Sequence, residues 1–591
     1  MISYPVSTSD AVTGGGSLLV LSIVIPVAGA LIAFAAGGRW SERIVAGTMP
    51  FGLAIAIAIM VTMRQSASPL VYLLGGWPPP LGIALRADGL SVVMIAITAV
   101  VICMIGVFAR TEFRTPAGSL EARGPFAFWI LLLAVWAALN TVFLGGDLFT
   151  LYVALELLTF AAVPLVCLDG RGATLQAALR YLLFALLGSA LYLVGAALLY
   201  GAYGTLDIVL LSQRVSAEPA TFVAAALMTV GLLAKTALFP SYLWLPPAHA
   251  GAPTPASAVL SGLVVKGSFF VAVRLWFNVM PGLPGAPAAQ LLAAFGSAAI
   301  IFGSVLALRQ ERLKLLIAYS TLAQIGYLFL MFPLAFDPAS GQIEGGALRG
   351  GVLQAASHAT AKAAMFLAAG MIYAALGHDR IQGLAGVARA LPISVLAFAV
   401  AGVALIGVPP SGVSLAKELL LQAAAETRQW LWAVAIQTGG IFTSGYLVLV
   451  VVQTLAPSAQ PVTVRNSVPH IQEAAALALA LCSLLLGLVP WQPYLSVSTS
   501  PPSLLTALTK ALWPILGGAV LAVLLGRWAL WLGRTPIEKI LVAAMSVARR
   551  PALVFSSRIE LIDGLLRQWP AAALTLLLVA SLFGAAMLAA R

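Results

Sequence analysis

Ionisable side chains lie deep inside stretches that otherwise have the composition of membrane spans. They are Glu156, Lys235, Lys266, Lys362 and Lys417, with His358 four residues before Lys362. A charge in hydrocarbon costs about 2.5–3.5 kcal/mol on insertion scales, so spans rarely keep such residues without a function. Carboxylates and lysines together inside a membrane usually mark a path for protons or ions. We therefore predict a proton or ion path through these residues.

The chemistry of such a path follows from burial and pairing. Burial without a partner favours the neutral form of a lysine, whereas a nearby carboxylate favours the charged form. A pair between Glu156 and Lys235 would hold the lysine proton when closed and release it when opened. His358 and Lys362 are four residues apart, so they share one helix face and can line one channel.

The composition indicates which elements must position these residues. The chain has 591 residues, of which 61% are apolar and only 9% charged, and its mean hydropathy is +1.02. Apolar runs long enough to cross a bilayer as helices recur from end to end. Their centres lie near residues 27, 55, 99, 135, 158, 190, 230, 264, 298, 324, 361, 399, 440, 482, 522 and 580. We predict an all-α polytopic membrane protein.

Cofactor and metal motifs are missing from the sequence. Cys103, Cys167 and Cys482 stand singly in apolar runs, without the paired spacing of iron–sulfur, haem or zinc sites. No glycine-rich nucleotide loop follows a strand pattern. We expect no cofactor, no metal and no redox or hydrolytic site in this chain.

Basic residues gather in alternate loops, although the net charge is +12 overall. Residues 1–16 carry no Lys or Arg, which favours an external N-terminus. The loops then expected inside the cell hold Arg39, Arg43, Arg110, Arg114, Arg123, Arg171, Arg180, Arg309, Arg312, Lys314, Arg380, Arg389, Arg465 and the block from Arg527 to Arg567. This asymmetry follows the positive-inside rule and does not indicate nucleic acid.

Two spans are interrupted by proline. The span at 221–239 meets Pro240, with a proline-rich loop expected after it, and the span at 390–407 meets Pro409 and resumes at 415–426. Irregular backbone at membrane depth is tolerated only inside protein or beside a water-filled cavity. Each break has a lysine nearby. Two broken segments in corresponding places point to an inverted repeat with its site at the breaks.

The chain therefore divides into six predicted parts. They are N-terminal transmembrane helices (1–125), a first repeat (126–276), a second, inverted repeat (288–453), additional transmembrane helices (454–533), an amphipathic cytoplasmic segment of one or two helices (534–569) and a C-terminal transmembrane helix (570–591). The amphipathic segment mixes apolar residues with arginines and is too charged to span.

Five stretches carry motifs of a known family. They are GGDLFTLYVALELLTF (145–160), GLLAKTALFPSYLWLPPAHAGAPTPASAVLSGLVVKG (231–267), LRQERLKLLIAYSTLAQIGY (308–327), SHATAKAAMFLAAG (357–370) and GVPPSGVSLAKELLL (407–421). In this order they resemble the antiporter-like subunits of respiratory complex I, energy-converting membrane hydrogenases and Mrp-type Na+/H+ antiporters. The first and last look closest to Mrp D-type and hydrogenase-type members.

The resemblance implies a fold and a set of roles. It implies about fourteen core transmembrane helices with two inverted five-helix repeats and two broken helices, to which this chain adds about two at its C-terminus. The family's path residues correspond to Glu156 on the fifth helix, Lys235 on the broken seventh, Lys266 on the eighth, His358 and Lys362 on the eleventh, and Lys417 on the broken twelfth. His249 matches an accessory loop histidine. Pro247 departs from the family, where many members carry Asp.

These observations predict a proton-translocating or Na+/H+-exchanging subunit of a multi-subunit membrane complex. Coupling to a membrane oxidoreductase is favoured by the C-terminal extension, which could brace neighbouring subunits; whether the chain counts as part of an enzyme stays open. Two alternatives are an Mrp-type secondary Na+/H+ antiporter subunit and the membrane partner of an inorganic-carbon uptake system. The expected partners are other membrane subunits, the lipid bilayer and protons or Na+. The expected location is the inner (cytoplasmic) membrane, with several spans and an external N-terminus.

Overall fold

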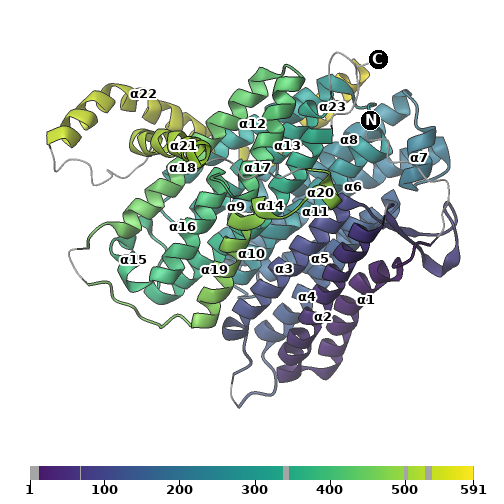
Figure 1. Cartoon of the computed structure of the whole chain (residues 1–591), viewed down its shortest axis with the longest axis horizontal. Coiled ribbons are helices and arrows are strands. Elements are labelled where there is room, and N and C mark those ends of the chain that lie inside the picture. The colour runs from purple at the N-terminus through teal and green to yellow at the C-terminus, as the bar shows by residue number, and fades with distance from the viewer. Residues whose placement is uncertain are drawn as a thin grey trace.

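Helices occupy the apolar runs of the sequence (Figure 1). The computed structural model describes residues 12–589 apart from 67, 117, 337–344, 459–460, 498–503 and 526–535. Within this part of the chain, fourteen helices are long and apolar enough to cross a membrane, and two shorter apolar helices, Pro392–Ile406 and Leu512–Leu524, fill the remaining runs. The prediction of an all-α polytopic membrane protein is confirmed.

The helices and strands follow one another in this order: α1 (Ser17–Ala36), α2 (Gly38–Gln65), β1 (Leu70–Leu73), η1 (Leu74–Gly76), β2 (Ala84–Ala87), α3 (Gly89–Glu112), α4 (Arg123–Leu144), α5 (Leu148–Val166), α6 (Gly172–Tyr203), α7 (Ile208–Arg214), α8 (Pro219–Thr236), η2 (Tyr242–Trp244), α9 (Leu245–Gly251), α10 (Thr254–Val259), η3 (Leu260–Val264), α11 (Val265–Arg274), η4 (Leu275–Val279), α12 (Gly285–Arg309), α13 (Leu313–Leu334), α14 (Gly345–Leu376), η5 (Ile381–Leu384), α15 (Val387–Ala390), α16 (Pro392–Ile406), α17 (Gly412–Glu426), α18 (Trp430–Leu455), α19 (His470–Leu485), η6 (Leu486–Leu488), α20 (Gln492–Leu495), α21 (Leu504–Leu525), α22 (Pro536–Leu566) and α23 (Trp569–Leu588).

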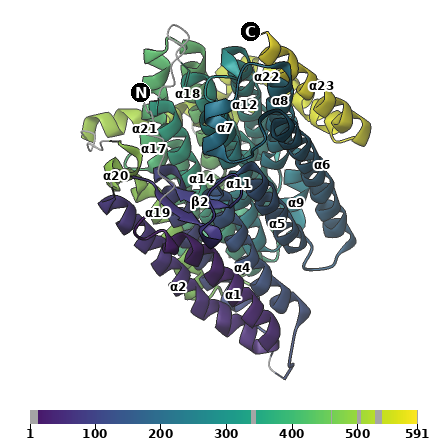
Figure 2. The ribbon, with the colours of Figure 1, turned by 90° about the vertical axis from the view of Figure 1, so that its right-hand side faces the viewer.

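The core of the bundle lies around α10–η4, α13 and α14. Every residue in the most apolar stretch of the span Thr254–Val279 is buried, against 28% of that stretch in α1, α2 and α23. Figure 2 shows α1 and α2 along one flank and α23 at another. The outer helices therefore face lipid, and ionisable residues on α11 and α14 are shielded from lipid by protein.

The first broken helix ends at Thr236 and resumes after a short gap. Ala237 has φ +60°, and the amide of Leu238 bonds the Leu233 carbonyl at 3.2 Å, which is the Schellman type of helix end. The prediction of a proline-rich loop here is wrong, because the chain resumes as the helices η2 and α9. Pro246 and Pro247 occupy the first turn of α9, where the missing amide of proline removes no hydrogen bond.

The second broken helix repeats this backbone pattern. α16 ends with Gly407 at φ +90°, and the Val408 amide bonds the Val403 carbonyl at 3.4 Å. Ser411 then caps α17, its side chain accepting the amide of Ser414. The predicted resumption of this span after the prolines is confirmed. Both spans therefore end in the same way, and the inverted repeat itself stays a prediction.

A small antiparallel hairpin, which the sequence did not lead us to expect, lies at one end of the bundle. β1 pairs with β2 so that Leu70 faces Ala87 and Leu73 faces Ala84. The amide of Gly146 donates to the Ala84 carbonyl at 3.0 Å. The hairpin therefore joins the start of α3 to the start of α5.

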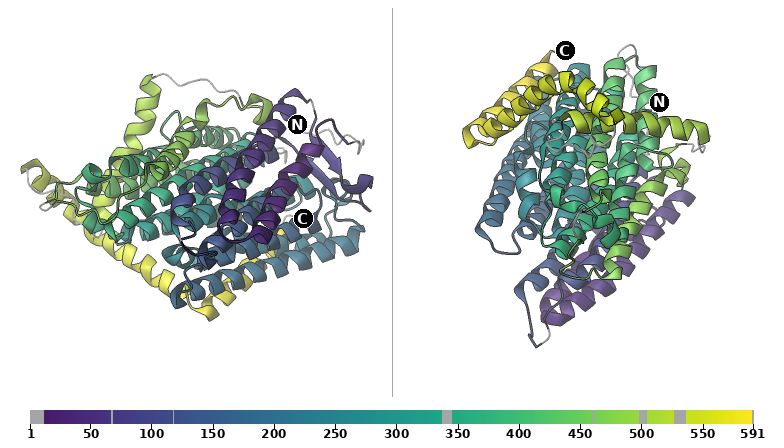
Figure 3. Two further views of the ribbon diagram at one scale, coloured as in Figure 1. Left: turned by 90° about the horizontal axis from the view of Figure 1, so that it is seen from below. Right: turned by 90° about the vertical axis from the view of Figure 1, so that its left-hand side faces the viewer.

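The amphipathic segment forms a single helix, α22, followed by α23. Residues 526–535, which include its predicted start, lie outside the described residues. Figure 3 shows both helices in yellow along one side of the bundle. The last turns of α22 contact this chain, since Glu560 pairs with Arg309 of α12 at 3.1 Å. Contacts of α22 with other subunits stay a prediction.

Candidate functional site

Glu156 of α5 and Lys235 of α8 form an ion pair inside the membrane region. Lys235 Nζ donates to Glu156 Oε1 at 3.0 Å and to Thr159 Oγ1 at 3.0 Å. The Ser189 hydroxyl also donates to Glu156. The side chains of Lys235 and Glu156 are only 6% and 15% exposed. Removing either partner would leave a charge with little water around it, which is the costly way to break a buried pair.

Two glycines set the position of Lys235. A Cβ atom on Gly188 of α6 would come within 2.6 Å of the Gly231 carbonyl oxygen, and one on Gly231 within 2.3 Å of the Gly188 carbonyl oxygen. Small residues allow membrane helices to approach this closely. The close packing of α6 on α8 therefore places Lys235 beside α5.

Lys266 and Lys362 lie at the centre of the bundle, and both are fully buried. The Lys266 ammonium donates to the carbonyl of Ser261, which belongs to the π-helical segment η3; such segments are frequent at functional sites. Lys362 donates to the hydroxyl of Ser320 on α13. Among the residues that the structure describes, neither lysine has an ion-pair partner, although their two charges act on each other.

The two histidines of the predicted path are also fully buried. His358 lies one turn before Lys362 on α14, and His249 lies on α9 against the ring of Phe366, with centroids 4.7 Å apart. No described residue hydrogen-bonds either ring nitrogen of His249 or His358. Buried polar atoms normally have hydrogen-bond partners, so both rings differ from ordinary packing histidines.

Uncharged polar residues outside the predicted set lie next to the predicted path, between Lys362 and α18. Gln324 donates to Thr443 at 3.0 Å and lies 3.4 Å from the Tyr446 hydroxyl, and Gln354 donates to Gln324 at 3.1 Å. Ser320 and Gln324 are four residues apart, as are Gln354 and His358. This spacing on one helix face is the signal that could have found them.

Lys417 lies one turn inside α17, next to the second break. Its ammonium donates to the carbonyl of Ile406 at 2.9 Å and lies 5.3 Å from the centre of the Tyr327 ring. Glu418 is exposed and pairs with Lys510 of α21 at 3.1 Å. The carboxylate beside Lys417 in the sequence therefore points away from it, as the helical turn predicts.

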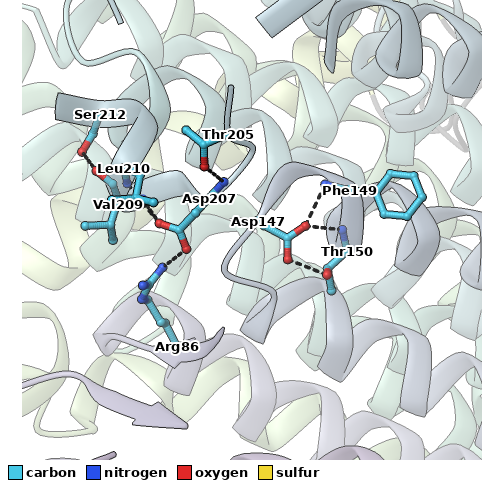
Figure 4. Close-up of polar contacts among 9 residues, drawn as sticks. All are labelled: Arg86, Asp147, Phe149, Thr150, Thr205, Asp207, Val209, Leu210 and Ser212. Atoms are coloured by element: carbon cyan, nitrogen blue, oxygen red, sulfur yellow. Dashed lines mark hydrogen bonds and ion pairs between the residues drawn. The ribbon is translucent and has the colours of Figure 1, made fainter. Parts of the chain in front are cut away.

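Two aspartates and one arginine lie at the end of the bundle that carries the hairpin (Figure 4). Asp147 caps α5 through the amides of Phe149 and Thr150. Asp207 caps α7 and pairs with Arg86 of β2 at 2.7 Å. These contacts are structural, because both carboxylates are held by helix amides.

The described residues contain no group of three or more His, Cys, Asp or Glu side chains that could hold a metal ion. The path is instead a row of separate ionisable and polar groups. Such a row can relay protons, or exchange them for small cations, if water fills the gaps.

Comparison with known proteins decides the family. The profile described as NADH:quinone oxidoreductase/Mrp antiporter, TM, matches residues 145–443. The chain belongs to this family. The matched range contains the six predicted path residues, Glu156, Lys235, Lys266, His358, Lys362 and Lys417, and the accessory His249.

Relatives come from two kinds of complex. The chain is 32% identical to the N subunit of NADH-quinone oxidoreductase of Desulforudis audaxviator over 451 residues, which are 73% of this chain and 85% of the relative. It is 28% identical to the D subunit of the Na(+)/H(+) antiporter of Alkalihalophilus pseudofirmus over 435 residues, 72% of this chain and 84% of the relative. Both match over most of their own length.

Solved structures share the fold. A chain of the Mrp complex from a Dietzia species superposes with a TM-score of 0.72 at 23% identity, covering 89% of this chain and 99% of that one. A chain of the archaeal membrane-bound sulfane sulfur reductase gives 0.71 at 25% identity, with 85% and 98% coverage. The resemblance stated from the sequence is confirmed by the family profile and the relatives, and these structures agree with it in fold.

Proposed function

We propose that this chain moves protons across the membrane through Glu156, Lys235, Lys266, His358, Lys362 and Lys417, as one subunit of a larger membrane complex. The observation that carries the proposal is the buried row itself, in which one lysine has a carboxylate partner and the other three donate hydrogen bonds only to hydroxyl or carbonyl oxygens. A buried lysine without a counter-charge exchanges its proton readily. Such a row stores and passes protons and has no redox chemistry of its own.

The relatives favour two driving mechanisms. The oxidoreductase relative supports coupling to a membrane oxidoreductase whose redox centres lie on other chains. The antiporter relative supports a second candidate, secondary Na+/H+ exchange within an Mrp-type assembly. The two differ in whether an electron donor is needed.

The test uses the complex purified from native membranes and reconstituted into vesicles. Under the first mechanism, acidification of the lumen requires an electron donor and acceptor and persists without Na+. Under the second, an imposed Na+ gradient alone drives proton movement. Vesicles that show neither response with the complex intact would contradict proton or cation transport by this chain.

We also propose the inner membrane as the location, with the arginine-rich ends of the helices in the cytoplasm and the N-terminus outside. Arg312 pairs with Asp379 at 2.9 Å at one end of α13, on the side predicted to be cytoplasmic. Single cysteines at Arg312 and Arg389 should react with an impermeant thiol reagent only in inverted vesicles. Reaction of position 312 in intact cells would reverse the orientation. The predicted external segment 337–344 lies outside the described residues.

A further inference from the structure

A cavity of about 1180 Å³ opens at the end of the bundle opposite the hairpin. α3 fixes this placement, because it begins beside β2 and ends with Glu112 in the cavity wall. The charged residues that line the cavity are Glu112, Asp169, Arg171, Arg180, Arg312 and Lys314. None of them belongs to the path proposed above.

Glu112 and Lys314 form the inner part of this wall. The Glu112 side chain is exposed and lines the cavity, and the charge of Lys314 acts on it. Lys314 is 8% exposed, although the sequence placed it in a basic loop. Its ammonium donates to the Ala252 carbonyl at 2.7 Å. Lys314 therefore holds the segment that follows α9, and Glu112 lies in the same cavity wall.

His249 lies directly behind this segment. Its neighbours Pro247 and Ala250 line the cavity, whereas His249 itself is fully buried with no described partner at either nitrogen. The charges of Lys314 and Lys362 both act on it. Thus the only side chain with exchangeable protons on this stretch of α9 stands between the cavity and the centre of the bundle.

We propose that Glu112 takes up protons from water in this cavity and that His249 passes them to Lys362. This inference rests on the proposed function, because Lys362 must belong to a path. The Glu112 carboxylate accepts a proton from hydronium and releases it, through water, to one nitrogen of His249. The imidazolium then gives the proton on its other nitrogen to the neutral Lys362 amine, which becomes ammonium. Lys314 is a positioning residue that holds the Ala252 carbonyl.

Asp169, the other carboxylate of the cavity wall at the end of α5, provides a matched control. It accepts the Thr174 hydroxyl at 2.5 Å and pairs with Arg171. Burial raises the pKa of Asp169, but hydrogen bonds from Thr174 and Arg171 outweigh it and hold that pKa below its usual value. Asp169 therefore stays ionised and is not expected to carry protons.

The first experiment measures proton transport by the reconstituted complex. Glu112→Gln keeps the size and polarity of the side chain but cannot carry a proton, so the rate should fall about tenfold or more, as for other positioned proton-transfer groups. Glu112→Asp should recover much of the rate, and Asp169→Asn should leave it unchanged. Lys314→Arg should retain more activity than Lys314→Met. An unchanged rate for Glu112→Gln would overturn the inference.

Lys362→Met separates this inference from the proposed function. Loss of transport in Lys362→Met together with a normal rate in Glu112→Gln would refute proton uptake at Glu112 alone. Normal transport in Lys362→Met would refute the path itself.

The second experiment tests the cavity without transport. In a chain whose three native cysteines are replaced by serine, Glu112→Cys should react with a charged, impermeant thiol reagent from the arginine-rich side only. Lys362→Cys, at a fully buried position, serves as the unreactive control. Failure of Glu112→Cys to react from that side would show that water does not reach this position and would overturn the inference.

Discussion

The two broken helices share a backbone and differ in what holds their lysines. Each break has a left-handed residue, Ala237 or Gly407, followed by the same hydrogen bond to the carbonyl five residues back. At the first break the lysine is held by a carboxylate, and at the second by a carbonyl and an aromatic ring. The two breaks thus share one backbone conformation, and they differ in the groups that contact the ammonium of each lysine.

At the first break, Lys235 depends on one side chain, Glu156, which a substitution can remove. Coulomb attraction between full charges at about 3 Å far exceeds that between a charge and a carbonyl dipole, particularly in a medium of low dielectric constant. At the second break, Lys417 depends on the backbone carbonyl of Ile406, which no side-chain substitution removes, and on the ring of Tyr327. The first break should therefore respond to mutation of its partner much more strongly than the second.

The largest effect is expected at the first lysine itself. Lys235→Met should abolish proton transport, because methionine has no exchangeable proton. Lys235→Arg should also impair transport, since arginine stays protonated in proteins. Lumen acidification by reconstituted complex gives the rate, and Lys510→Met, at an exposed pair, is the control. An unchanged transport rate for Lys235→Met in an assembled complex would contradict the proposal that Lys235 carries protons.

Glu156→Gln should lower turnover strongly without unfolding the protein. Glutamine keeps the shape of the side chain but removes the charge that faces Lys235 at 3.0 Å. A double-mutant cycle with Lys235→Met should be strongly non-additive, because the two residues act as one unit. Strictly additive losses would show that the pair is not coupled. Thermal unfolding of each variant in detergent checks that the fold persists.

A smaller effect is expected at the second break. Tyr327→Leu removes the ring beneath Lys417, and a cation–π contact is worth about 0.5–2 kcal/mol, so the transport rate should fall by a factor of about 2–30. Tyr327→Phe keeps the ring and should behave like the wild type. A loss as large as that of Glu156→Gln would contradict the difference drawn between the two breaks.

The smallest effect on transport is expected from the contact between the first break and α22. Tyr242, just beyond this break, donates to Asp563 at 2.6 Å, and Asp563 also pairs with Arg567 at 2.8 Å. Asp563→Asn should destabilise the protein by about 1–3 kcal/mol, measured by thermal unfolding. Arg558→Gln, on the exposed side of α22, is the control.

Removal of residues 534–591 extends this test to assembly. The core should still fold, and co-purification of other subunits should weaken. An unchanged yield of complex would mean that α22 and α23 serve this chain alone, and would remove the main reason for preferring an oxidoreductase assembly over a simple antiporter.

The sequence by itself determined the spans and the identity of most candidate path residues. Long apolar runs and prolines act locally, so the helices of the bundle and the two breaks could be located without knowledge of the fold. Charges in apolar runs are rare, which made Lys266 and Lys362 conspicuous. Uncharged polar residues are common in any span, so only their four-residue spacing from Ser320 and His358 distinguishes Gln324 and Gln354 from ordinary packing residues.

Tertiary structure decided which of these residues meet. Glu156 and Lys235 are 79 residues apart in the chain, and only the close packing of Gly188 on Gly231 brings them together. The sequence predicts Lys314 in a basic loop, because a charged residue at the start of a helix gives the same sequence pattern whether its side chain faces solvent or a cavity. The amphipathic pattern of α22 shows that it cannot span, but its partners Tyr242 and Tyr319 lie on distant helices. Hydrophobicity is a property of single residues, whereas a contact depends on how helices pack, which no single stretch of sequence specifies.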